Sequence, residues 1–548
     1  MTEETTAPDE MTQLSDTQRA VVTLMQDPAS YSAAVEAVTR HDTHASMVFL
    51  AGDFAYKVKR ALTYPYLDFG TLAKRRRACV AELRLNRRTA PDLYLGIVPI
   101  QWRADGSLHL GETISAVPDD GDLAAREASG EVAEYAVKMR RFDNDALLSA
   151  VSARSGLAPT TVDALADSVA RFHDTAAVVR RDPVRTHRDE IADNLADLRA
   201  SPELFDPEMV DRLEAGSYAA LQHHAERLAG RARDGFVRRC HGDLHLRNIV
   251  LLDGRPTLFD CIEFNDALAE IDVIYDLAFL LMDLDQRGQR VAANRLLTRY
   301  MNRRDDIGGL AALPLYLSLR AAIRAKVGAS ALAANAGSSS QAGQVRACRD
   351  YFAAACAYLD APGPRLIAVG GVSGTGKTTI ARGVAPEIGA APGALVVRSD
   401  VERKRLFDVA ETERLPESAY QGRINAEVYD RIHERARQAL TVGRSVVLEA
   451  TFLRREDRAQ ARKLAETVGV PFTGLWLTAP AETLKARVDA RRQDASDATA
   501  EIVAAQLDRA PKGETAWPTV DASGGVGDVT AAAKAVLAVH GHIAQEEG

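Results

Sequence analysis

The sequence predicts two folded parts, an α+β part followed by an α/β part. Strand-like segments are concentrated before residue 142, and helical spacing of apolar residues dominates from there to residue 360. Beyond a break at 361–364, short apolar strands alternate with helices, a pattern typical of a parallel sheet covered by helices on both faces. The chain has 548 residues, which is too long for one hydrophobic core, so a division into domains is expected.

The first part follows a mobile acidic tail, residues 1–20, and begins with a strand-rich lobe over residues 21–142. The predicted elements of this lobe are a helix over 21–38, a hairpin of strands 46–50 and 54–58 around Gly52, a basic helix over 72–88, and strands over 93–102 and 108–117. Arg75, Arg76 and Arg77, with Arg84, Arg87 and Arg88, are expected to form a solvated face of the basic helix, and binding of phosphate or a partner by them is the weaker alternative. A helical lobe, residues 143–360, completes the part and is interrupted only at 241–264.

The second part, residues 365–548, follows the linker Ala361-Pro362-Gly363-Pro364, which is stiff and breaks both helix and strand. Its predicted strands cover 366–369, 394–398, 445–448 and 472–477, with helices between them. One of these helices begins at Lys377, and a closing helix near 529–539 is expected to pack against the rest. This alternation indicates a parallel sheet.

Composition limits the classes of function. The net charge of -8 does not favour polyanions, so general nucleic-acid binding is not expected. The five cysteines form no CxxC pair and no run of about 18 apolar residues occurs, which predicts a cytoplasmic protein without membrane contact. The expected partners are small molecules, and the oligomeric state is left open.

Residues 241–248, His-Gly-Asp-Leu-His-Leu-Arg-Asn, have the spacing of a kinase-type catalytic loop, in which an Asn lies five positions after an Asp. Phosphoryl transfer to a hydroxyl needs a base near the acceptor, and Asp243 is the candidate. Asn248 and Asp260 are the candidate magnesium ligands, because a hairpin of 250–252 and 257–259 would return Asp260 to the loop.

A lysine candidate for nucleotide binding lies on the predicted strand 54–58. Lys57 ends the triplet Ala55-Tyr56-Lys57, and Glu82 lies on the following helix, where it could pair with Lys57 and hold it against the α and β phosphates. Side chains alternate along a strand, so Lys59 lies on the same face as Lys57, and the assignment between the two lysines is open.

These motifs, with Phe259-Asp260 and the later Tyr275-Asp276-Leu277-Ala278, resemble the aminoglycoside phosphotransferase and choline kinase group over residues 25–360. The resemblance implies a bilobal protein-kinase-like fold, in which Asp276 supports the catalytic loop from a buried helix. This chain departs from the kinase pattern because residues 42–46, Asp-Thr-His-Ala-Ser, replace a glycine-rich loop. A zinc site on His241 and His245 is a weaker alternative, since no third ligand is evident.

A complete Walker A loop spans residues 371–378, between a predicted strand and a predicted helix. Its glycines let backbone amides wrap phosphate oxygens, Lys377 reaches the β and γ phosphates, and the Thr378 hydroxyl ligates magnesium. The candidate nucleotide-binding residues are Gly371, Ser373, Gly374, Thr375, Gly376, Lys377, Thr378 and Thr379. A P-loop NTPase domain is therefore predicted.

Further candidates follow along the second part. Asp400 and Arg403, at the end of a strand, resemble the Asp-x-x-Arg of small P-loop kinases such as gluconate kinase, polynucleotide kinase and the zeta-toxin group, which implies a base and an acceptor clamp. Arg487 and Arg491 resemble the lid arginines of those kinases. Glu449 stands where these kinases usually have an aspartate that holds magnesium. The resemblance covers residues 365–525.

The combined expectation is a bifunctional ATP- and Mg²⁺-dependent kinase that phosphorylates hydroxyl groups of small molecules at two sites, with Asp243, Asp400 and Lys377 as the catalytic residues. Two alternatives remain: one half is a nucleotide-sensing module that controls a single kinase, or the P-loop half is an ATPase. The sequence does not identify either acceptor. Glu263 and neighbouring carboxylates are expected to be loop and helix-cap residues rather than a site for a cationic antibiotic.

Overall fold

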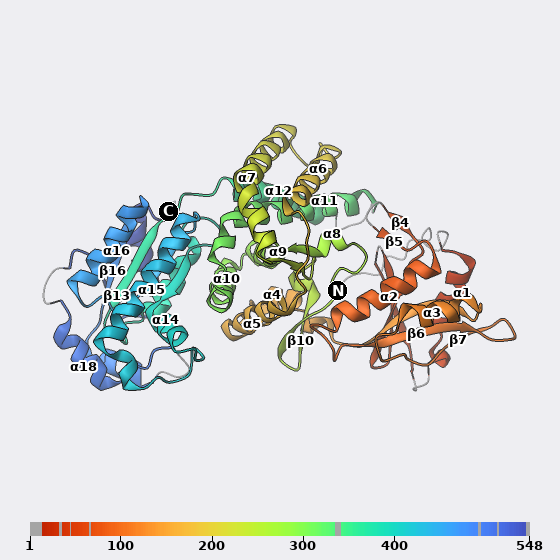
Figure 1. Ribbon diagram of the computed structural model, residues 1–548, viewed down its shortest axis with the longest axis horizontal. Coiled ribbons are helices and arrows are strands. Elements are labelled where there is room, and N and C mark those ends of the chain that lie inside the picture. Colours follow the sequence, from red (N-terminus) through yellow and green to blue (C-terminus); the bar gives the residue numbers. More distant parts are fainter. Residues whose placement is uncertain are drawn as a thin grey trace. The chain divides into compact units, whose positions relative to one another are not determined.

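The protein is described by a computed structural model (Figure 1), which covers residues 14–31, 35–43, 45–64, 67–334, 341–490, 495–511 and 515–543. Two compact units are present. The first comprises residues 1–157, 171–181 and 235–276, and the second comprises 158–170, 182–234 and 277–548. The predicted fold class is confirmed: a kinase-like α+β part precedes a P-loop kinase-like domain with a parallel sheet. The predicted boundary at 361–364 stays a prediction, and these residues are irregular backbone.

The first unit is built on a six-stranded antiparallel sheet, counted over the described residues, in the order β1-β2-β3-β8-β6-β7. The strands are β1 (Val38–Asp42), β2 (Ser46–Ala51), β3 (Phe54–Lys59), β6 (Tyr94–Trp102), β7 (Leu108–Leu110) and β8 (Val132–Arg140). Helix α1 (Asp16–Gln26) packs on one face and α2 (Leu72–Asn86) on the other, and α3 (Asp120–Ala128) lies beside α2 (Figure 1).

This packing decides which way the lysines of β3 point. Tyr56 and Val58 are buried in the cluster that contains the apolar residues of α1. Side chains alternate along a strand, so Lys57 and Lys59 face α2 on the other side of the sheet. Gly52 adopts a φ of +55° in the turn between β2 and β3, as the predicted hairpin requires.

Four predictions for this lobe were wrong. The strand expected over 108–117 ends at Leu110. The helix expected over 21–38 ends at Gln26, next to a proline-initiated turn, and strand β8 lies in a segment for which no strand was predicted. The arginines expected on a solvated helix face are also placed differently: Arg75 and Arg76 are each 6% exposed. Arg75 pairs with Glu134 of β8 at 2.8 Å, and Arg76 pairs with Asp120 at 2.9 Å.

The rest of the first unit consists of short elements around the predicted catalytic loop. They are α4 (Leu148–Ser155), β9 (Val237–Arg239), β10 (Ile249–Leu252), β11 (Arg255–Leu258), α8 (Asp266–Ala269) and β12 (Glu270–Asp272), with β4 (Thr63–Tyr64) and β5 (Leu67–Asp68) in the N-terminal lobe. Strands β10 and β11 form the predicted antiparallel hairpin, with Ile249 opposite Leu258. Helices α5 (Pro159–Thr175) and α9 (Val273–Gln286) contribute residues to both units.

The second unit contains five further helices before its sheet, among the described residues: α6 (Pro183–Arg199), α7 (Pro207–Arg233), α10 (Arg290–Arg304), α11 (Leu313–Ala334) and α12 (Gln341–Leu359). One segment in the described part of the chain, Ile307–Ala333, has the length and apolarity of a membrane span. Its most apolar window is 78% buried inside the protein, as in a core helix.

The parallel sheet of the second unit has the strand order β14-β15-β13-β16-β17. Its strands are β13 (Leu366–Gly371), β14 (Leu395–Arg398), β15 (Val446–Glu449), β16 (Phe472–Thr478) and β17 (Thr519–Asp521). Its helices are α13 (Lys377–Val384), α14 (Ser399–Leu406), α15 (Gly422–Thr441), α16 (Arg455–Val468), α17 (Ala481–Asp489), α18 (Ala500–Arg509) and α19 (Val526–Val539). Helices α13 and α19 pack on one face of the sheet. The four predicted strands are confirmed, and β17 was missed.

Candidate active sites

A buried charge network lies where strand β3 faces helix α2. The Lys57 ammonium donates to Glu82 Oε1 at 2.9 Å and to Asp260 Oδ1 at 2.6 Å. Glu82 has no exposed side-chain surface, whereas the side chain of Lys57 is 14% exposed. The structure therefore forms the predicted Lys57–Glu82 pair, and the β10–β11 hairpin returns Asp260 to the same lysine.

Lys59 lies behind this pair. Its ammonium is 2.5 Å from Glu82 Oε2 and also contacts Glu263, and its side chain is only 2% exposed. Glu263, expected to be a loop residue, is thus a buried ion-pair partner. Lys57 is the lysine that contacts Asp260, and the assignment of nucleotide binding to one of the two lysines stays a prediction.

Attraction between the lysines and the carboxylates of this network keeps both kinds of side chain charged. Burial alone would lower the pKa of Lys57, but the carboxylates of Asp260 and Glu82 raise it well above its usual value. Burial would raise the pKa of Glu82, yet Lys57 and Lys59 together lower it. Lys57 is therefore a permanent cation next to Asp260, as contact with nucleotide phosphates requires.

The predicted catalytic loop is closed by a bond between Asp243 and its last residue, Asn248. Asn248 Nδ2 donates to Asp243 Oδ2 at 2.8 Å and to the Asp243 carbonyl at 2.9 Å. Gly242 has a φ of +86°, and a Cβ there would lie 2.8 Å from the Leu268 carbonyl oxygen, so the turn requires glycine. The structure brings Asp243 and Asn248 together as predicted.

The zinc alternative does not fit this loop. His241 Nε2 donates to the Phe259 carbonyl at 2.9 Å, and its Nδ1 accepts the Asp243 backbone N–H at 3.3 Å. Both ring nitrogens of His241 are therefore engaged within the loop, which leaves neither for a metal ion.

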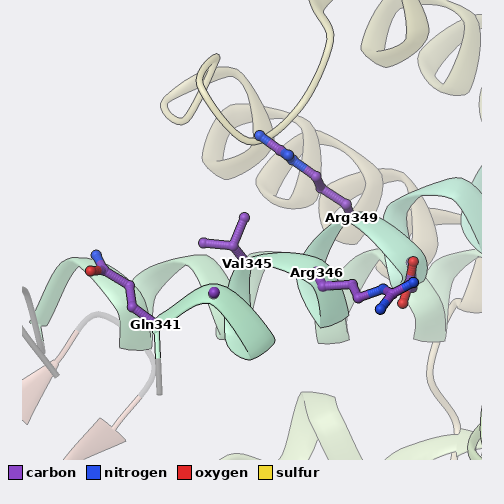
Figure 2. Close-up of a pocket in the computed structure, with 6 residues that line it drawn as sticks. Gln341, Val345, Arg346 and Arg349 are labelled. Carbon is purple, nitrogen blue, oxygen red and sulfur yellow. The ribbon is translucent and has the colours of Figure 1, made fainter. Parts of the chain in front are cut away.

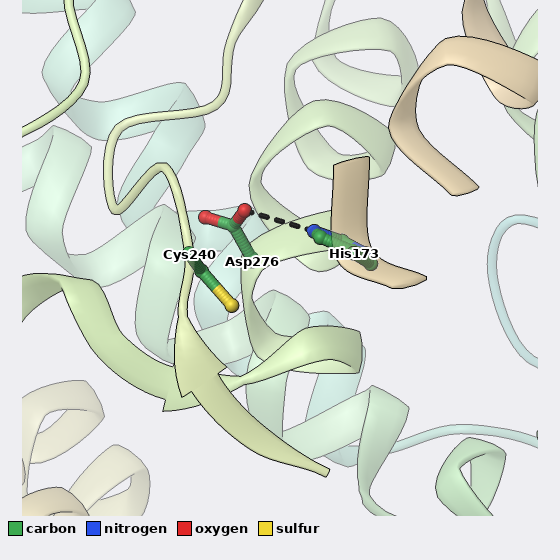
Figure 3. Close-up of side chains that lie close together, drawn as sticks. All are labelled: His173, Cys240 and Asp276. Carbon is green, nitrogen blue, oxygen red and sulfur yellow. Dashed lines mark hydrogen bonds and ion pairs between the residues drawn. The ribbon is translucent and has the colours of Figure 1, made fainter. Parts of the chain in front are cut away.

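A buried aspartate anchors the same loop from helix α9 (Figure 3). Asp276 Oδ2 accepts the His241 backbone N–H at 3.1 Å and lies 3.0 Å from His173 Nε2, and its Oδ1 accepts the Gly242 N–H at 2.9 Å. The Cys240 thiol lies close to this pair, but burial raises its pKa well above the usual value, so it stays protonated. The group has the geometry of a hydrogen-bonded anchor, as the family resemblance implies for Asp276.

The Walker A loop of the second unit has the backbone that its glycines predict. Gly371, Gly374 and Gly376 have φ values of +146°, +90° and +84°. Lys377 points back over the loop and donates to the Val372 carbonyl at 3.2 Å. The loop leads directly from β13 into α13, so backbone N–H groups and the helix N-terminus surround the space that a phosphate chain would occupy.

The predicted magnesium ligands of this half are in contact with each other. The Thr378 hydroxyl donates to Glu449 Oε2 at 3.0 Å, so Glu449 lies in the expected place despite its extra methylene. Arg398, which the sequence analysis missed, donates to Glu449 at 2.7 Å and to Thr378 Oγ1 at 2.9 Å. Burial would raise the pKa of Glu449, but Arg398 and Lys377 lower it. The oxygen donors of Thr378 and Glu449 suit a hard ion such as Mg²⁺.

Asp400 and Arg403 both lie on α14 but have different surroundings. Burial, with a smaller contribution from Glu449, raises the pKa of Asp400. Arg403 donates to the Ala419 carbonyl at 2.7 Å and to Asn425 at 2.8 Å, and it stacks on the Tyr420 ring at 4.6 Å. Arg403 therefore holds the segment before α15 in place.

The remaining nucleotide-binding candidates are dispersed. Thr379 is exposed on α13. Arg487 on α17 donates to the Ala522 carbonyl at 2.8 Å, next to the end of β17. Arg491 lies outside the described residues. A further cluster, which was not predicted, surrounds Asp497. Its carboxylate accepts from the Lys404 ammonium at 2.6 Å and from the Tyr420 hydroxyl at 2.7 Å.

Helix α14 is also held from helix α10, within the second unit. Arg405 contacts Asp305 at 3.0 Å and Glu402 at 2.9 Å. Arg435 of α15 contacts Asp305 and lies 3.1 Å from Glu402. Asn294 of α10 donates to the Ala394 carbonyl, next to β14, at 2.8 Å. These contacts tie helix α14 of the P-loop domain to the preceding helical segment.

Two hollows on the second unit lie apart from these motifs. One of about 580 Å³ is formed by α12, where Gln341, Val345, Arg346 and Arg349 line it (Figure 2), and one of about 470 Å³ is lined mainly by α7, α11 and α12. No predicted site residue in the described part of the chain lines either hollow.

Comparison with protein families gives two matches. Residues 129–313 match a family described as "Phosphotransferase enzyme family", and residues 366–512 match one described as "AAA domain". The uncharacterized proteins Rv2004c of Mycobacterium tuberculosis and Mb2027c of Mycobacterium bovis are each 34% identical to this chain over 478 residues, which is 85% of this chain and 88% of theirs.

Solved structures match the two parts of the chain separately. A choline/ethanolamine kinase family protein from Mesorhizobium loti is 15% identical and covers 63% of this chain and 98% of its own, with a TM-score of 0.32. A gluconokinase from Sinorhizobium meliloti is 22% identical and covers 32% of this chain and 93% of its own, with a TM-score of 0.24. The two resemblances inferred from the sequence are confirmed by the family matches.

Proposed function

The chain belongs to the same family as the mycobacterial protein Rv2004c, and we propose that it is a bifunctional ATP-dependent kinase with one active site in each unit. Each site would transfer the γ-phosphoryl group of ATP to a hydroxyl group of a small molecule. The observation that carries the proposal is that each unit has its own lysine that would bind phosphate and its own carboxylate that would hold a metal ion. These are Lys57 and Asp260 in the first unit, and Lys377 and Glu449 in the second.

In the first unit, Lys57 would hold nucleotide phosphates, since its charge is fixed by Glu82. Asp243 would accept the proton of the acceptor hydroxyl, and the 2.8 Å bond from Asn248 orients its carboxylate. The amide oxygen of Asn248 and the carboxylate of Asp260 would hold Mg²⁺, which neutralises charge on the transferring phosphoryl group when bound.

In the second unit, the loop amides and Lys377 would bind the phosphate chain, and Thr378 with Glu449 would hold the metal ion. Asp400 would serve as the base. Burial raises its pKa, which brings a carboxylate closer to the basicity that proton transfer at neutral pH requires. Arg403 would order the acceptor side of the site through its contacts with Ala419 and Asn425.

The test is a transfer assay on the full-length protein with γ-labelled ATP and a panel of sugars, nucleosides, amino alcohols and aminoglycosides. We expect Asp243→Asn to remove one set of labelled products, Lys377→Ala to remove another, and the double variant to remove both, each by at least about 100-fold. The double-site proposal is wrong if both single variants keep the full wild-type product set.

The same assay separates the alternatives. A nucleotide-sensing half would bind MgATP without forming any labelled product, and its binding-site variant would change the rate of the other half. A P-loop ATPase would release labelled inorganic phosphate without an acceptor. The description of the second matched family as an AAA domain makes this control necessary.

A further inference from the structure

One peptide group of the Walker A loop is held at both ends. The carbonyl of Val372 accepts from the Lys377 ammonium at 3.2 Å, from the Thr375 hydroxyl at 2.8 Å and from the Thr375 backbone N–H at 3.2 Å. The N–H of the same peptide, which belongs to Ser373, donates to Gln506 Oε1 at 2.8 Å. Gln506 lies on α18, 133 residues further along the chain, so no local motif indicates this contact.

Helix α18 is fixed close to the loop by apolar packing. Val503 of α18 is fully buried in a cluster with Val372, Leu484 and Val488. Gln506 lies three positions after Val503 and therefore on the same side of the helix. The buried cluster thus aims the partly buried Gln506 side chain at the loop.

The geometry of a trans peptide places Gln506 across from Lys377. The carbonyl oxygen and the N–H of a trans peptide point in opposite directions, so the glutamine and the lysine lie on opposite sides of the same planar group. A backbone N–H can only donate, which requires the amide oxygen of Gln506 to face it. Hydrogen bonds in such a chain polarise one another, so the bond to Gln506 strengthens the carbonyl as an acceptor for Lys377.

We propose that Gln506 is a positioning residue for Lys377, which acts by fixing the orientation of the 372–373 peptide. The inference rests on the proposed nucleotide site of the second unit. Without the Gln506 acceptor, only Thr375 and Lys377 itself would hold this peptide, and the carbonyl that aims the Lys377 ammonium at the β and γ phosphates would be less firmly fixed. Gln506 need not touch the nucleotide for this effect.

The test is a double-mutant cycle in the full-length protein. Lys57→Met serves as the reference background, because it weakens nucleotide binding in the first unit. Calorimetry with Mg²⁺ and the β,γ-imido analogue of ATP then measures binding at the P-loop. The variants are Gln506→Met, which is of similar length but has no acceptor, and Gln506→Glu, which keeps an acceptor for the Ser373 N–H. Each is made with Lys377 and with Lys377→Ala.

We expect Gln506→Met to weaken binding roughly tenfold when Lys377 is present and less than twofold when it is alanine, because coupled residues are non-additive. Gln506→Glu should stay within about threefold of the reference, since the acceptor is retained. Equal losses in the two lysine backgrounds would overturn the inference, as would a loss in Gln506→Glu larger than in Gln506→Met, which would indicate direct contact with phosphate.

The same experiment tells a failure of this inference from a failure of the proposed function. If the reference protein binds the analogue and Lys377→Ala weakens that binding, the P-loop site stands, and the cycle judges Gln506 alone. If the reference protein shows no binding, the proposed site of the second unit is wrong and the role of Gln506 is overturned with it. Unfolding temperatures of all variants identify any loss that reflects misfolding.

Discussion

Replacement of Asp276 by asparagine tests how the catalytic loop of the first unit is held. Asp276 Oδ2 serves two groups, the His241 N–H and the His173 ring, and Oδ1 serves the Gly242 N–H. An asparagine oxygen can take the place of Oδ2, but its NH₂ group then faces the Gly242 N–H. One buried donor loses its acceptor, and the two remaining bonds lose the contribution of a charged partner.

The loss of loop stability follows from the number of hydrogen bonds that are lost or weakened. An unpaired buried N–H costs about 1 to 3 kcal/mol, and each bond that changes from a charged to a neutral acceptor loses about 1 kcal/mol. The sum is about 3 to 5 kcal/mol in the stability of the loop. A factor of ten corresponds to about 1.4 kcal/mol, so local opening should become at least roughly 100-fold more frequent.

Hydrogen exchange measured by mass spectrometry on the full-length protein is the suitable assay, because it needs no acceptor substrate. Peptides that cover 236–262 should exchange at least about 100-fold faster in Asp276→Asn than in wild type. Asp272→Asn is the matched control: Asp272 is also buried, and its Oδ1 accepts the Ile274 N–H, a bond that asparagine can keep. Unchanged exchange in Asp276→Asn, or equal acceleration in both variants, would refute the anchoring role.

Three further predictions concern other sites. Lys57→Met should reduce labelled transfer by the first unit at least about 100-fold. Lys59→Met should instead lower the free energy of unfolding by about 3 to 5 kcal/mol in urea unfolding, because the buried carboxylate of Glu263 and the Oε2 atom of Glu82 lose the cation that they contact. A Lys59→Met protein that is as stable as wild type but has lost transfer would contradict this assignment. Burial, followed by the nearby cations, lowers the pKa of His542 to about 4. The folded state therefore takes up the His542 proton at a lower pH than the unfolded chain does. Its stabilising effect is complete above pH 6.5 and disappears as the pH falls to about 4, and His542→Gln should reduce this slope in thermal unfolding between pH 4 and 6.5. Asp305→Ala should lower the stability of the second unit by about 1.5 to 3 kcal/mol in urea unfolding, since two arginines lose a charged acceptor; a change below about 0.5 kcal/mol would show that the contact with α10 is weak.

The parts of both sites that lie within one short motif were predictable from the sequence. An Asn five positions after an Asp, with a glycine between His241 and Asp243, defines a turn whose closing bond is local. The Walker A glycines likewise determine the loop and the start of α13. Asp260 was found because the hairpin that returns it to the loop is itself a local structure.

The residues that were missed depend on tertiary contacts. Arg398 and Gln506 reach the Walker A region from other elements, and nothing in their immediate sequence marks them. Strand β8 was missed because both of its faces are covered, so Val132–Val137 shows no alternation of buried and exposed positions. Arg75 was read as solvated because its partner, Glu134, lies 59 residues away.

Helix α14 shows why the P-loop site should be studied in the full-length chain. Asp400 and Arg403 lie three positions apart and share one side of the helix, while Glu402 and Arg405 share another. Arg405 of the second pair contacts Asp305, which caps the C-terminus of helix α10 in a left-handed conformation with a φ of +56°. Truncation before β13 would remove Asp305 and leave Arg405 with one acceptor fewer. The helix that carries the proposed base would then lose part of its support, so inactivity of an isolated P-loop domain would not show that the site is inactive in the intact protein.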